Sequence, residues 1–432
     1  MQINRTFNGT KSRKSNKTFD RVSLAEVDKL INKAQKGNLE AQLTLANLYE
    51  TDKGVLNVGL AAMWYLEAAE NGSVAAQAKV GQLYLNGVGI ARDYNEAIKW
   101  LQKASDQGSI DALASLAWCY QRAMGVTHDA HYAFSLFQRA AEQGHAGAQY
   151  NLAHMYAHGR GVEKNTDEAL KWFRLSAAQG NGKAQLRLGV IYAKGLGVDQ
   201  NDIEAVEWFR KAAESGYAKA QFNLGHMYAE GRGVPKDDAQ AVRWFRLAAQ
   251  QGYIRAEYNV GLYYLSGRGV NQSNTDAIDC FLKAAAKNYS RAQYQLGKLY
   301  LNGDGMPVNL QEAFSWFKLS AEHGFTNAQY RLARCYLEGT GTKIDETEAF
   351  NWFLKAAMQS HAPAQYYLGM MYSKGLGVEK DFVKAYSWMY VAASAQHEPA
   401  TGALDRITEK LSPRQLTEAV QNGERLNQEY GG

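Results

Sequence analysis

Two histidines at helical spacing are the first candidates for chemistry in this sequence of 432 residues. His154 and His158 lie four positions apart, which would place both imidazoles on one face of a helix, a geometry that can chelate a metal ion. No acidic residue or cysteine completes a ligand set, and His226 occupies the same position of a repeating pattern as His154. We therefore expect solvent-facing histidines and no metal or other cofactor.

Paired glycines could instead indicate a loop that cradles phosphate. Such pairs occur at Gly159 and Gly161, at residues 195–197, and at Gly231 and Gly233. A phosphate loop follows a β-strand, however, and these pairs recur every 36 residues between helical patterns. We expect them to permit positive φ angles in tight connections between helices, and we expect no nucleotide site.

The residue arrangements of common nucleophilic enzymes are also missing. No Gly-x-Ser-x-Gly elbow occurs, and the cysteines and histidines follow the repeat pattern. Charges such as Asp167, Glu168 and Lys171 fit the hydrated outer face of a helix. The sequence predicts no catalytic residues, no small-molecule substrate and no enzyme.

The elements that would position all these residues are set by a period of 36 residues. Eight of the nine tryptophans lie on one grid with this period: Trp64, Trp100, Trp172, Trp208, Trp244, Trp316, Trp352 and Trp388. Alanine and tyrosine columns, from Ala112 to Ala364 and from Tyr120 to Tyr372, follow the same grid. Such a period indicates a tandem array in which each unit contacts only its neighbours, and the tryptophans are expected in its core.

Each unit is predicted to contain two helices. One apolar helical pattern runs from Ala148 to Tyr156 and ends at Gly159, and a second runs from Ala169 to Ala177 and ends at Gly180. The second helix of every unit is preceded by a residue that favours the N-cap: Asn57, Asp93, Asp129, Asn165, Asn201, Asp237, Ser273, Asn309, Asp345 and Asp381. Six of these helices also carry the acidic or amide half of a capping box: Glu96, Glu168, Glu204, Gln240, Glu312 and Glu348.

Residues 220–228 (AQFNLGHMY), 231–234 (GRGV) and 241–249 (AVRWFRLAA) resemble the Sel1-like repeat family, which is similar to tetratricopeptide repeats. The resemblance covers about residues 40–397. It implies an all-α, right-handed α/α superhelical solenoid of about ten helix-turn-helix repeats with helical caps, acting as a protein-interaction scaffold or adaptor. Repeats one and three depart from the glycine pattern at residues 53–55 and 123–125.

The flanking segments divide the chain further. We expect a disordered, basic tail over 1–22, an N-terminal capping helix over 23–38, the repeats over 39–397, and C-terminal capping helices over 398–432. Terminal caps are expected because the end repeats of a solenoid would otherwise expose apolar faces.

Composition points to a cytoplasmic protein. The formal charge of +5 is too small to indicate a nucleic-acid binder, and no apolar stretch of 18 residues predicts a membrane span. Residues 1–21 lack the apolar segment of a signal peptide, although non-classical export stays open. Cys119, Cys280 and Cys335 fall on core positions of the grid and are expected as buried thiols.

A binding surface is expected on the first helix of each repeat, which lines the concave side of tetratricopeptide-like stacks. In one repeat Lys219, Asn223, His226 and Glu230 form a stripe beside the apolar face, and equivalent stripes along the chain carry twelve basic and four acidic residues. This bias favours an acidic or carboxylate-ended protein or peptide, with an ordinary solvated stripe as the alternative. The candidate partner-binding residues are Trp118, Arg122, His154, His158, Arg187, Lys194, Lys219, Asn223, Arg255, Asn259, Arg291, Lys298, Arg331, Arg334, Tyr367 and Met370.

Two other functions stay open at this point. Proteins of the resembled family include bacterial proteins that engage host factors, so the chain is alternatively an exported effector or surface protein. A cysteine-rich branch of the family is linked to penicillin binding and β-lactamase activity, but this sequence lacks a cysteine pair within any repeat. Nucleic acid is a weaker alternative, because the basic stripe lacks regularly interleaved aromatic residues.

Overall fold

The computed structural model describes residues 24–51 and 56–431, and within them it contains 23 helices and no strand. Ten helices, called the A helices, open the repeats: α2 (Leu39–Thr51), α4 (Val74–Asn86), α6 (Ile110–Arg122), α8 (Ala146–His158), α10 (Gly182–Lys194), α12 (Ala218–Glu230), α14 (Ile254–Ser266), α16 (Ser290–Asn302), α18 (Thr326–Glu338) and α20 (Ala362–Lys374). The ten B helices alternate with them: α3 (Val58–Glu70), α5 (Tyr94–Asp106), α7 (Ala130–Glu142), α9 (Thr166–Ala178), α11 (Asp202–Glu214), α13 (Asp238–Gln250), α15 (Asn274–Ala285), α17 (Leu310–Glu322), α19 (Glu346–Ala357) and α21 (Phe382–Ser394).

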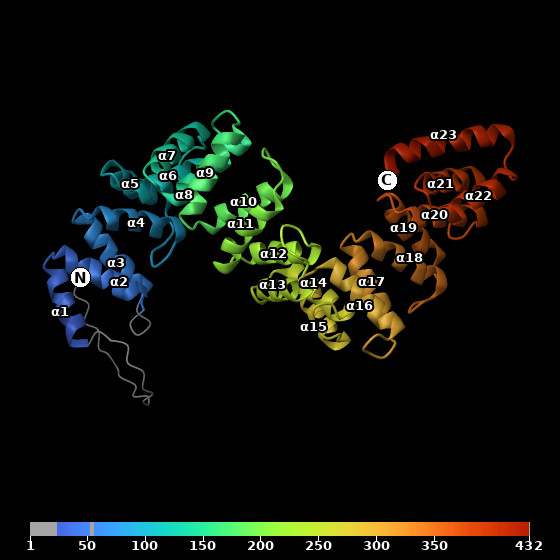
Figure 1. Ribbon diagram of the computed structural model, residues 1–432, viewed down its shortest axis with the longest axis horizontal. Helices are drawn as coiled ribbons and strands as arrows, with labels where there is room; N and C mark the ends of the chain where they lie inside the picture. Colours follow the sequence, from blue (N-terminus) through green and yellow to red (C-terminus); the bar gives the residue numbers. More distant parts are fainter. Residues whose placement is uncertain (1–23, 52–55, 432) are drawn as a thin grey trace. The chain divides into compact units, whose positions relative to one another are not determined.

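Packing between sequential helices builds the fold. The chain divides into two compact units, 1–188 and 189–432, with the division inside α10. In the described part of the first unit α1 (Leu24–Gln35) to α9 pack in chain order, and in the second unit α11 to α21 do the same (Figure 1). Contacts of this kind between near neighbours confirm the predicted all-α solenoid class.

The N-caps predicted for the B helices are all formed. In each of the ten, the predicted Asn, Asp or Ser accepts a hydrogen bond from a backbone N–H of the first turn. Asn57, for example, accepts from the N–H of Leu60 at 3.0 Å. Ten identical starts fix where every B helix begins, and with it the register of the residues that follow.

The capping-box prediction is wrong for all six B helices, because the backbone N–H of each N-cap residue donates instead to a tyrosine carbonyl of the preceding A helix, as Asn165 does to Tyr156 at 3.0 Å. In α9 the Oε2 atom of Glu168 accepts a hydrogen bond from the indole N–H of Trp172 at 3.0 Å, and in α19 Glu348 does the same for Trp352 at 3.1 Å. These carboxylates lie one helical turn before the tryptophan, so each can accept the hydrogen bond of the indole N–H. These two glutamates therefore hold Trp172 and Trp352 in place.

The loop between helices needs glycine for two different reasons. Gly231 ends α12 in the left-handed conformation, with a φ of 71°. Gly233 has a φ of 67°, and a Cβ atom there would overlap the backbone carbonyl of Asp202 at the start of α11. Repeat three keeps the same geometry with Ala123 in the left-handed conformation at a φ of 57°. The departing loop of repeat one, at 53–55, lies outside the described residues.

Aromatic and aliphatic side chains fill the space between helices. The largest fully buried side chains include a phenylalanine column on the B helices: Phe137, Phe173, Phe245, Phe281, Phe317 and Phe353. The tryptophan column is buried or half-buried throughout, which confirms its packing role.

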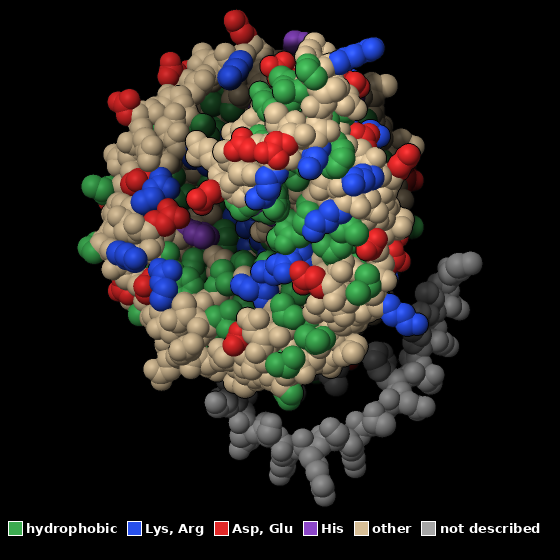
Figure 2. All heavy atoms as spheres, turned by 90° about the vertical axis from the view of Figure 1, so that its right-hand side faces the viewer, with side chains coloured by type: hydrophobic (Ala, Val, Ile, Leu, Met, Phe, Trp, Pro, Cys, Tyr) green, Lys and Arg blue, Asp and Glu red, His purple; other side chains and the backbone are tan. Residues whose placement is uncertain are grey.

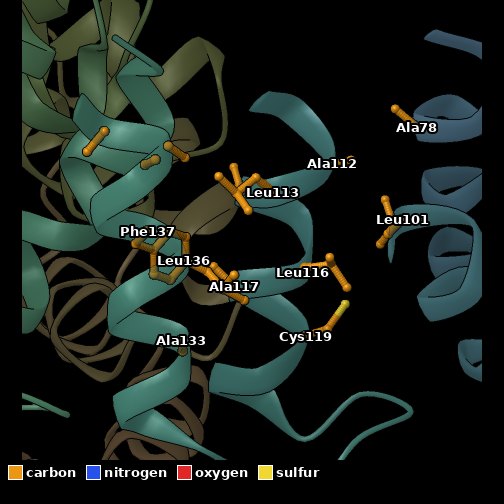
Figure 3. Packing of buried hydrophobic residues seen from close by; sticks show 14 of the residues in the cluster. Ala78, Leu101, Ala112, Leu113, Leu116, Ala117, Cys119, Ala133, Leu136 and Phe137 are labelled. Atoms are coloured by element: carbon orange, nitrogen blue, oxygen red, sulfur yellow. The ribbon is translucent and has the colours of Figure 1, made fainter. Parts of the chain in front are cut away.

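The three cysteines are free. Figure 3 shows Cys119 of α6 pointing toward Leu101 of α5 among buried alanines and leucines. Cys335 is also buried, whereas Cys280 is half-buried, so the expectation of buried thiols holds for two of the three. Burial raises the pKa of each thiol to about 11.

A column of buried glutamines joins consecutive repeats, and the sequence reasoning missed it. Gln329 on α18 donates from Nε2 to the carbonyl of Ala321 in the preceding B helix at 3.3 Å. Its Oε1 accepts a hydrogen bond from Gln359, after the following B helix, at 2.8 Å. A bond of this kind to the preceding helix, which for Gln42 is α1, is formed by eight glutamines: Gln42, Gln77, Gln149, Gln185, Gln221, Gln293, Gln329 and Gln365.

The C-terminal helices are α22 (Glu398–Thr408) and α23 (Pro413–Tyr430). Ser412 forms a capping box with Gln415 at the start of α23. This helix packs back on α21, where Ser387 donates to the carbonyl of Ala419 at 3.0 Å. The predicted tail over 1–22, and Ser23, lie outside the described residues.

Candidate protein-binding surface

The side chains of the A helices that do not enter the core form the candidate surface, called here the A-helix surface. All sixteen predicted partner-binding residues lie on A helices between α6 and α20, and none is buried. Six are exposed: Arg122, His158, Lys194, Lys219, Arg255 and Arg291. The other ten are half-buried: Trp118, His154, Arg187, Asn223, Asn259, Lys298, Arg331, Arg334, Tyr367 and Met370.

Successive A helices touch through these side chains. Asn259 on α14 lies 3.2 Å from His226 on α12, measured between the amide and imidazole nitrogens. Gln295 on α16 donates to the hydroxyl of Tyr258 on α14 at 3.4 Å. These contacts bring residues more than 30 positions apart side by side, so in the second unit the A-helix surface continues from one repeat to the next.

In the first unit the A-helix surface is hollowed beside Trp118. This hollow of about 350 Å³ is lined by α4, α6 and α8, including Asp111, Trp118, His145 and Asn151. Trp118 also packs against the core, and the guanidinium of Arg122 lies 5.2 Å from its ring centroid. An indole that is partly packed and partly exposed at a hollow offers a firm hydrophobic contact to a ligand.

Histidine and arginine side chains cluster near the end of α8. The rings of His154 and His158 are 4.4 Å apart between centroids. Burial lowers the pKa of both histidines, and the nearby positive charges of Arg187 and Arg160 lower it further. The Nε atom of Arg187 is buried and has no hydrogen-bond partner. A carboxylate would satisfy this donor and relieve the repulsion among the cations.

The second unit carries a basic row on the A-helix surface. Lys219, Arg255 and Arg291 occupy equivalent positions on α12, α14 and α16, and none forms an ion pair with a described residue. Both arginines act electrostatically on Tyr289, whose pKa is raised chiefly by burial and held back by the two guanidinium groups. These three cations are therefore available to acidic groups of a ligand.

Other candidates are partly engaged within the protein. Arg334 forms an ion pair with Glu338, with 2.9 Å between Nε and Oε1. The ring of Tyr367 stacks on that of Phe353 at 4.9 Å, and Met370 packs beside the cluster around Met389. Their exposed parts border the same surface, but these side chains also stabilise the fold.

Figure 2 shows lysine and arginine side chains interspersed with hydrophobic ones on the face that carries the C-terminal helices.

Across the described ranges, no group of three histidine, cysteine, aspartate or glutamate side chains is arranged to hold a metal ion. Among residues 24–51 and 56–431, no helix combines the length and hydrophobicity that crossing a bilayer requires. The side chains of the A-helix surface offer charge and aromatic contact to a ligand.

Comparison with known proteins identifies the repeat. Ten consecutive segments from residue 39 to residue 397 match the family model described as Sel1 repeat. A search of curated proteins gave no match. Among solved structures, the chain is similar to c5321 of uropathogenic Escherichia coli, described as a protective antigen displaying an SLR fold. The identity is 31%, the alignment covers 94% of this chain and 95% of that one, and the TM-score is 0.62.

Two further solved structures are similar over shorter lengths. A Sel1 repeat protein from Oxalobacter formigenes is 30% identical, with 80% of this chain and 89% of that one covered and a TM-score of 0.49. A Sel1 repeat protein from Klebsiella pneumoniae is 25% identical, with 46% and 97% covered and a TM-score of 0.34.

Proposed function

Because the chain belongs to the Sel1 repeat family, whose members generally mediate protein–protein interactions, we propose that it is a non-catalytic scaffold or adaptor that binds a partner segment on its A-helix surface. The solenoid is typical of scaffolds, since successive repeats present side chains of one helix in register. A partner bound there contacts several repeats at once.

The observation that carries the acidic character of the partner is the set of unpaired cations. Lys219, Arg255 and Arg291 in the second unit form no ion pair with a described residue, and Arg187 in the first has a buried Nε without a partner. Leaving such a donor unsatisfied is costly in a folded protein, and a ligand carboxylate removes that cost. Trp118 beside its hollow supplies the apolar contact that charge alone does not give.

The test compares two charge-reversal variants with the same change in net charge. Arg255→Glu with Arg291→Glu alters the A-helix surface, whereas Arg243→Glu with Lys318→Glu alters exposed positions on B helices of the same unit. Fluorescence anisotropy with a labelled Asp/Glu-rich peptide is expected to show binding to the wild type and to the B-helix variant, and at least tenfold weaker binding to the A-helix variant.

Affinity capture from a native lysate with the same three proteins then identifies the partner. Proteins retained by the wild type and the B-helix variant, and lost from the A-helix variant, are the expected partners. Equal loss from both variants would mean that overall charge rather than the A-helix surface governs binding. Equal melting temperatures establish that all three proteins are folded.

A second candidate, an exported or surface protein that binds a host protein, has one observation in its favour. The relative c5321, which is 31% identical over nearly the whole chain, is described as a protective antigen. A reporter fused to the intact chain separates the two: recovery in the medium or at the cell surface supports export, and retention supports a cytoplasmic adaptor.

A further inference from the structure

One repeat has a cysteine where eight others have tryptophan. Several tryptophans of the column have equivalent neighbours. Trp172 packs within a cluster that includes Ala141, Leu152 and Tyr156, which precede it by 31, 20 and 16 positions. The corresponding alanine, leucine or valine, and tyrosine also accompany Trp100 and Trp352. In these repeats the indole packs against equivalent apolar side chains.

At Cys280 these receiving side chains remain, and the space between them is open. Ala249, Val260 and Tyr264, at the same three distances along the chain, line a hollow of about 270 Å³ together with Cys280. Val260 at its floor is buried, whereas the rim formed by Arg246 and other charged residues is exposed. The thiol is much smaller than an indole, so a hollow that opens to solvent remains where other repeats hold an indole.

Acceptors for an indole N–H are retained as well. Trp172 donates to Glu168, four positions before it, and Asp276 holds that position relative to Cys280 and lines the hollow. Glu257, only 8% exposed, also lines it; its Oε2 atom is buried and has no hydrogen-bond partner. A buried carboxylate oxygen left unpaired is a strong acceptor for a donor that enters the hollow.

A lysine that covers the indole in some other repeats is present too. Lys211 and Lys355, three positions after their tryptophans, lie over the indole rings with Nζ 4.3 and 3.8 Å from the centroids. Lys283 holds this position after Cys280 and lines the hollow, where its Nζ pairs with Asp279 at 2.6 Å. The hollow thus has the buried apolar residues, the hydrogen-bond acceptors and the lysine that an indole would contact.

We propose that the hollow formed by α13, α14 and α15 around Cys280 is a binding site for the indole side chain of a tryptophan presented by a partner protein. The ring would lie on Ala249 and Val260, with its N–H donating to Asp276 or Glu257 and Lys283 over its face. The partner thereby supplies the one side chain that this repeat lacks. The site is formed by α13 to α15 and includes none of the sixteen candidate residues of the A-helix surface.

The test uses N-acetyl-tryptophanamide as the probe and NMR spectroscopy of the full chain as the readout. The wild type is expected to show saturable shifts at residues lining the hollow, in the millimolar range or below, on the order of what a ligand of this size reaches. Cys280→Trp is expected to weaken probe binding at least tenfold and to raise the melting temperature, because the protein's own indole then fills the hollow. A higher melting temperature also shows that the variant is folded.

Further outcomes bear on the proposal directly. The benzofuran analogue of the probe, which lacks the N–H, is expected to bind several-fold more weakly. Absence of saturable binding, or binding that survives in Cys280→Trp, overturns the proposal. Binding of free indole without binding of N-acetyl-tryptophanamide also overturns it, since the occupant would then be a small free aromatic and not a protein side chain.

Discussion

Glu257 Oε1 accepts a hydrogen bond from Lys287 Nζ at 2.7 Å, at the point where other repeats join a glutamine to a neutral side chain. In six repeats an Asn, Gln or His at the position of Lys287 bonds to the glutamine, as Gln359 does to Gln329. A glutamate cannot donate to the carbonyl that the glutamine column binds, so this repeat is held by an ion pair with a buried carboxylate.

We predict that Lys287→Ala destabilises the second unit by about 2–3 kcal/mol, because it leaves the Glu257 carboxylate buried without a counter-charge. The double variant Glu257→Gln with Lys287→Gln should lie within about 1 kcal/mol of the wild type, since it restores the pair found in other repeats. Urea unfolding followed by circular dichroism measures both. Equal destabilisation by the single and double variants would contradict the assignment.

Replacing the left-handed alanine of repeat three should raise the stability of the protein instead of lowering it. Ala123→Gly should stabilise the first unit by about 1 kcal/mol, because an L-residue pays a steric penalty at a φ of 57° that glycine avoids. Gly159 occupies the same position one repeat later, and Gly159→Ala should destabilise by a similar amount. Thermal unfolding of both variants checks the pair, and a destabilising Ala123→Gly would rule out this explanation.

The second loop glycine should be far less replaceable than the first. Gly231→Ala introduces only the unfavourable φ, whereas Gly233→Ala also drives a Cβ atom into the carbonyl of Asp202. We expect Gly233→Ala to cost about 3 kcal/mol or more, against about 1 kcal/mol for Gly231→Ala. Matching melting temperatures for the two variants would show that the loop can move away from α11.

Acid should weaken the start of α20. His361 Nδ1 accepts a hydrogen bond from the N–H of Ala364 at 3.2 Å, which requires a neutral ring, and burial lowers its pKa from 6.5. Because the unfolded chain then binds the proton first, this contribution to stability is present above pH 6.5 and is lost as the pH falls through the lower, folded-state value.

The matched variant for this effect is His361→Asn, since Asn181 caps α10 at the equivalent position. Its melting temperature should fall less steeply between pH 7 and pH 5 than that of the wild type, because the amide stays an acceptor at every pH. Parallel pH profiles would indicate that His361 does not contribute to acid sensitivity.

The thiols should react slowly and unequally in the native protein. Burial raises the pKa of all three to about 11, so little thiolate exists at pH 8. Iodoacetamide followed by mass spectrometry should modify half-buried Cys280 before buried Cys119 and Cys335, and all three rapidly in urea. Faster labelling of Cys119 than of Cys280 would contradict the burial described above.

The sequence predicted those features that depend on residues close together in the chain. The N-caps from Asn57 to Asp381 and the loop glycines act within a few residues of their position, so residue type and spacing identify them. The packing role of the tryptophan column could be predicted because such regular recurrence is typical of a core position. The residues next to the tryptophans recur with the same period.

Features that join neighbouring repeats were harder to foresee. The bond between Gln329 and Gln359 spans 30 residues, and nothing local in either residue indicates it, although glutamine recurring on the grid was a usable signal. The hollow at Cys280 required knowing what surrounds a tryptophan elsewhere in the array. Likewise, residue spacing alone could not show whether the ring of Tyr367 is exposed or stacks on Phe353.

The interlocking of consecutive repeats has a consequence for how such a chain can change over generations. In most loops the second glycine meets a helix of the previous repeat, as Gly233 meets α11, and most repeats carry the glutamine that bonds to the helix before it, so most junctions between repeats are built from the same parts. Unequal crossing-over that inserts or deletes 36 codons recreates an existing junction. The number of repeats is therefore free to vary under selection, whereas a change by any other number of codons breaks the register at once.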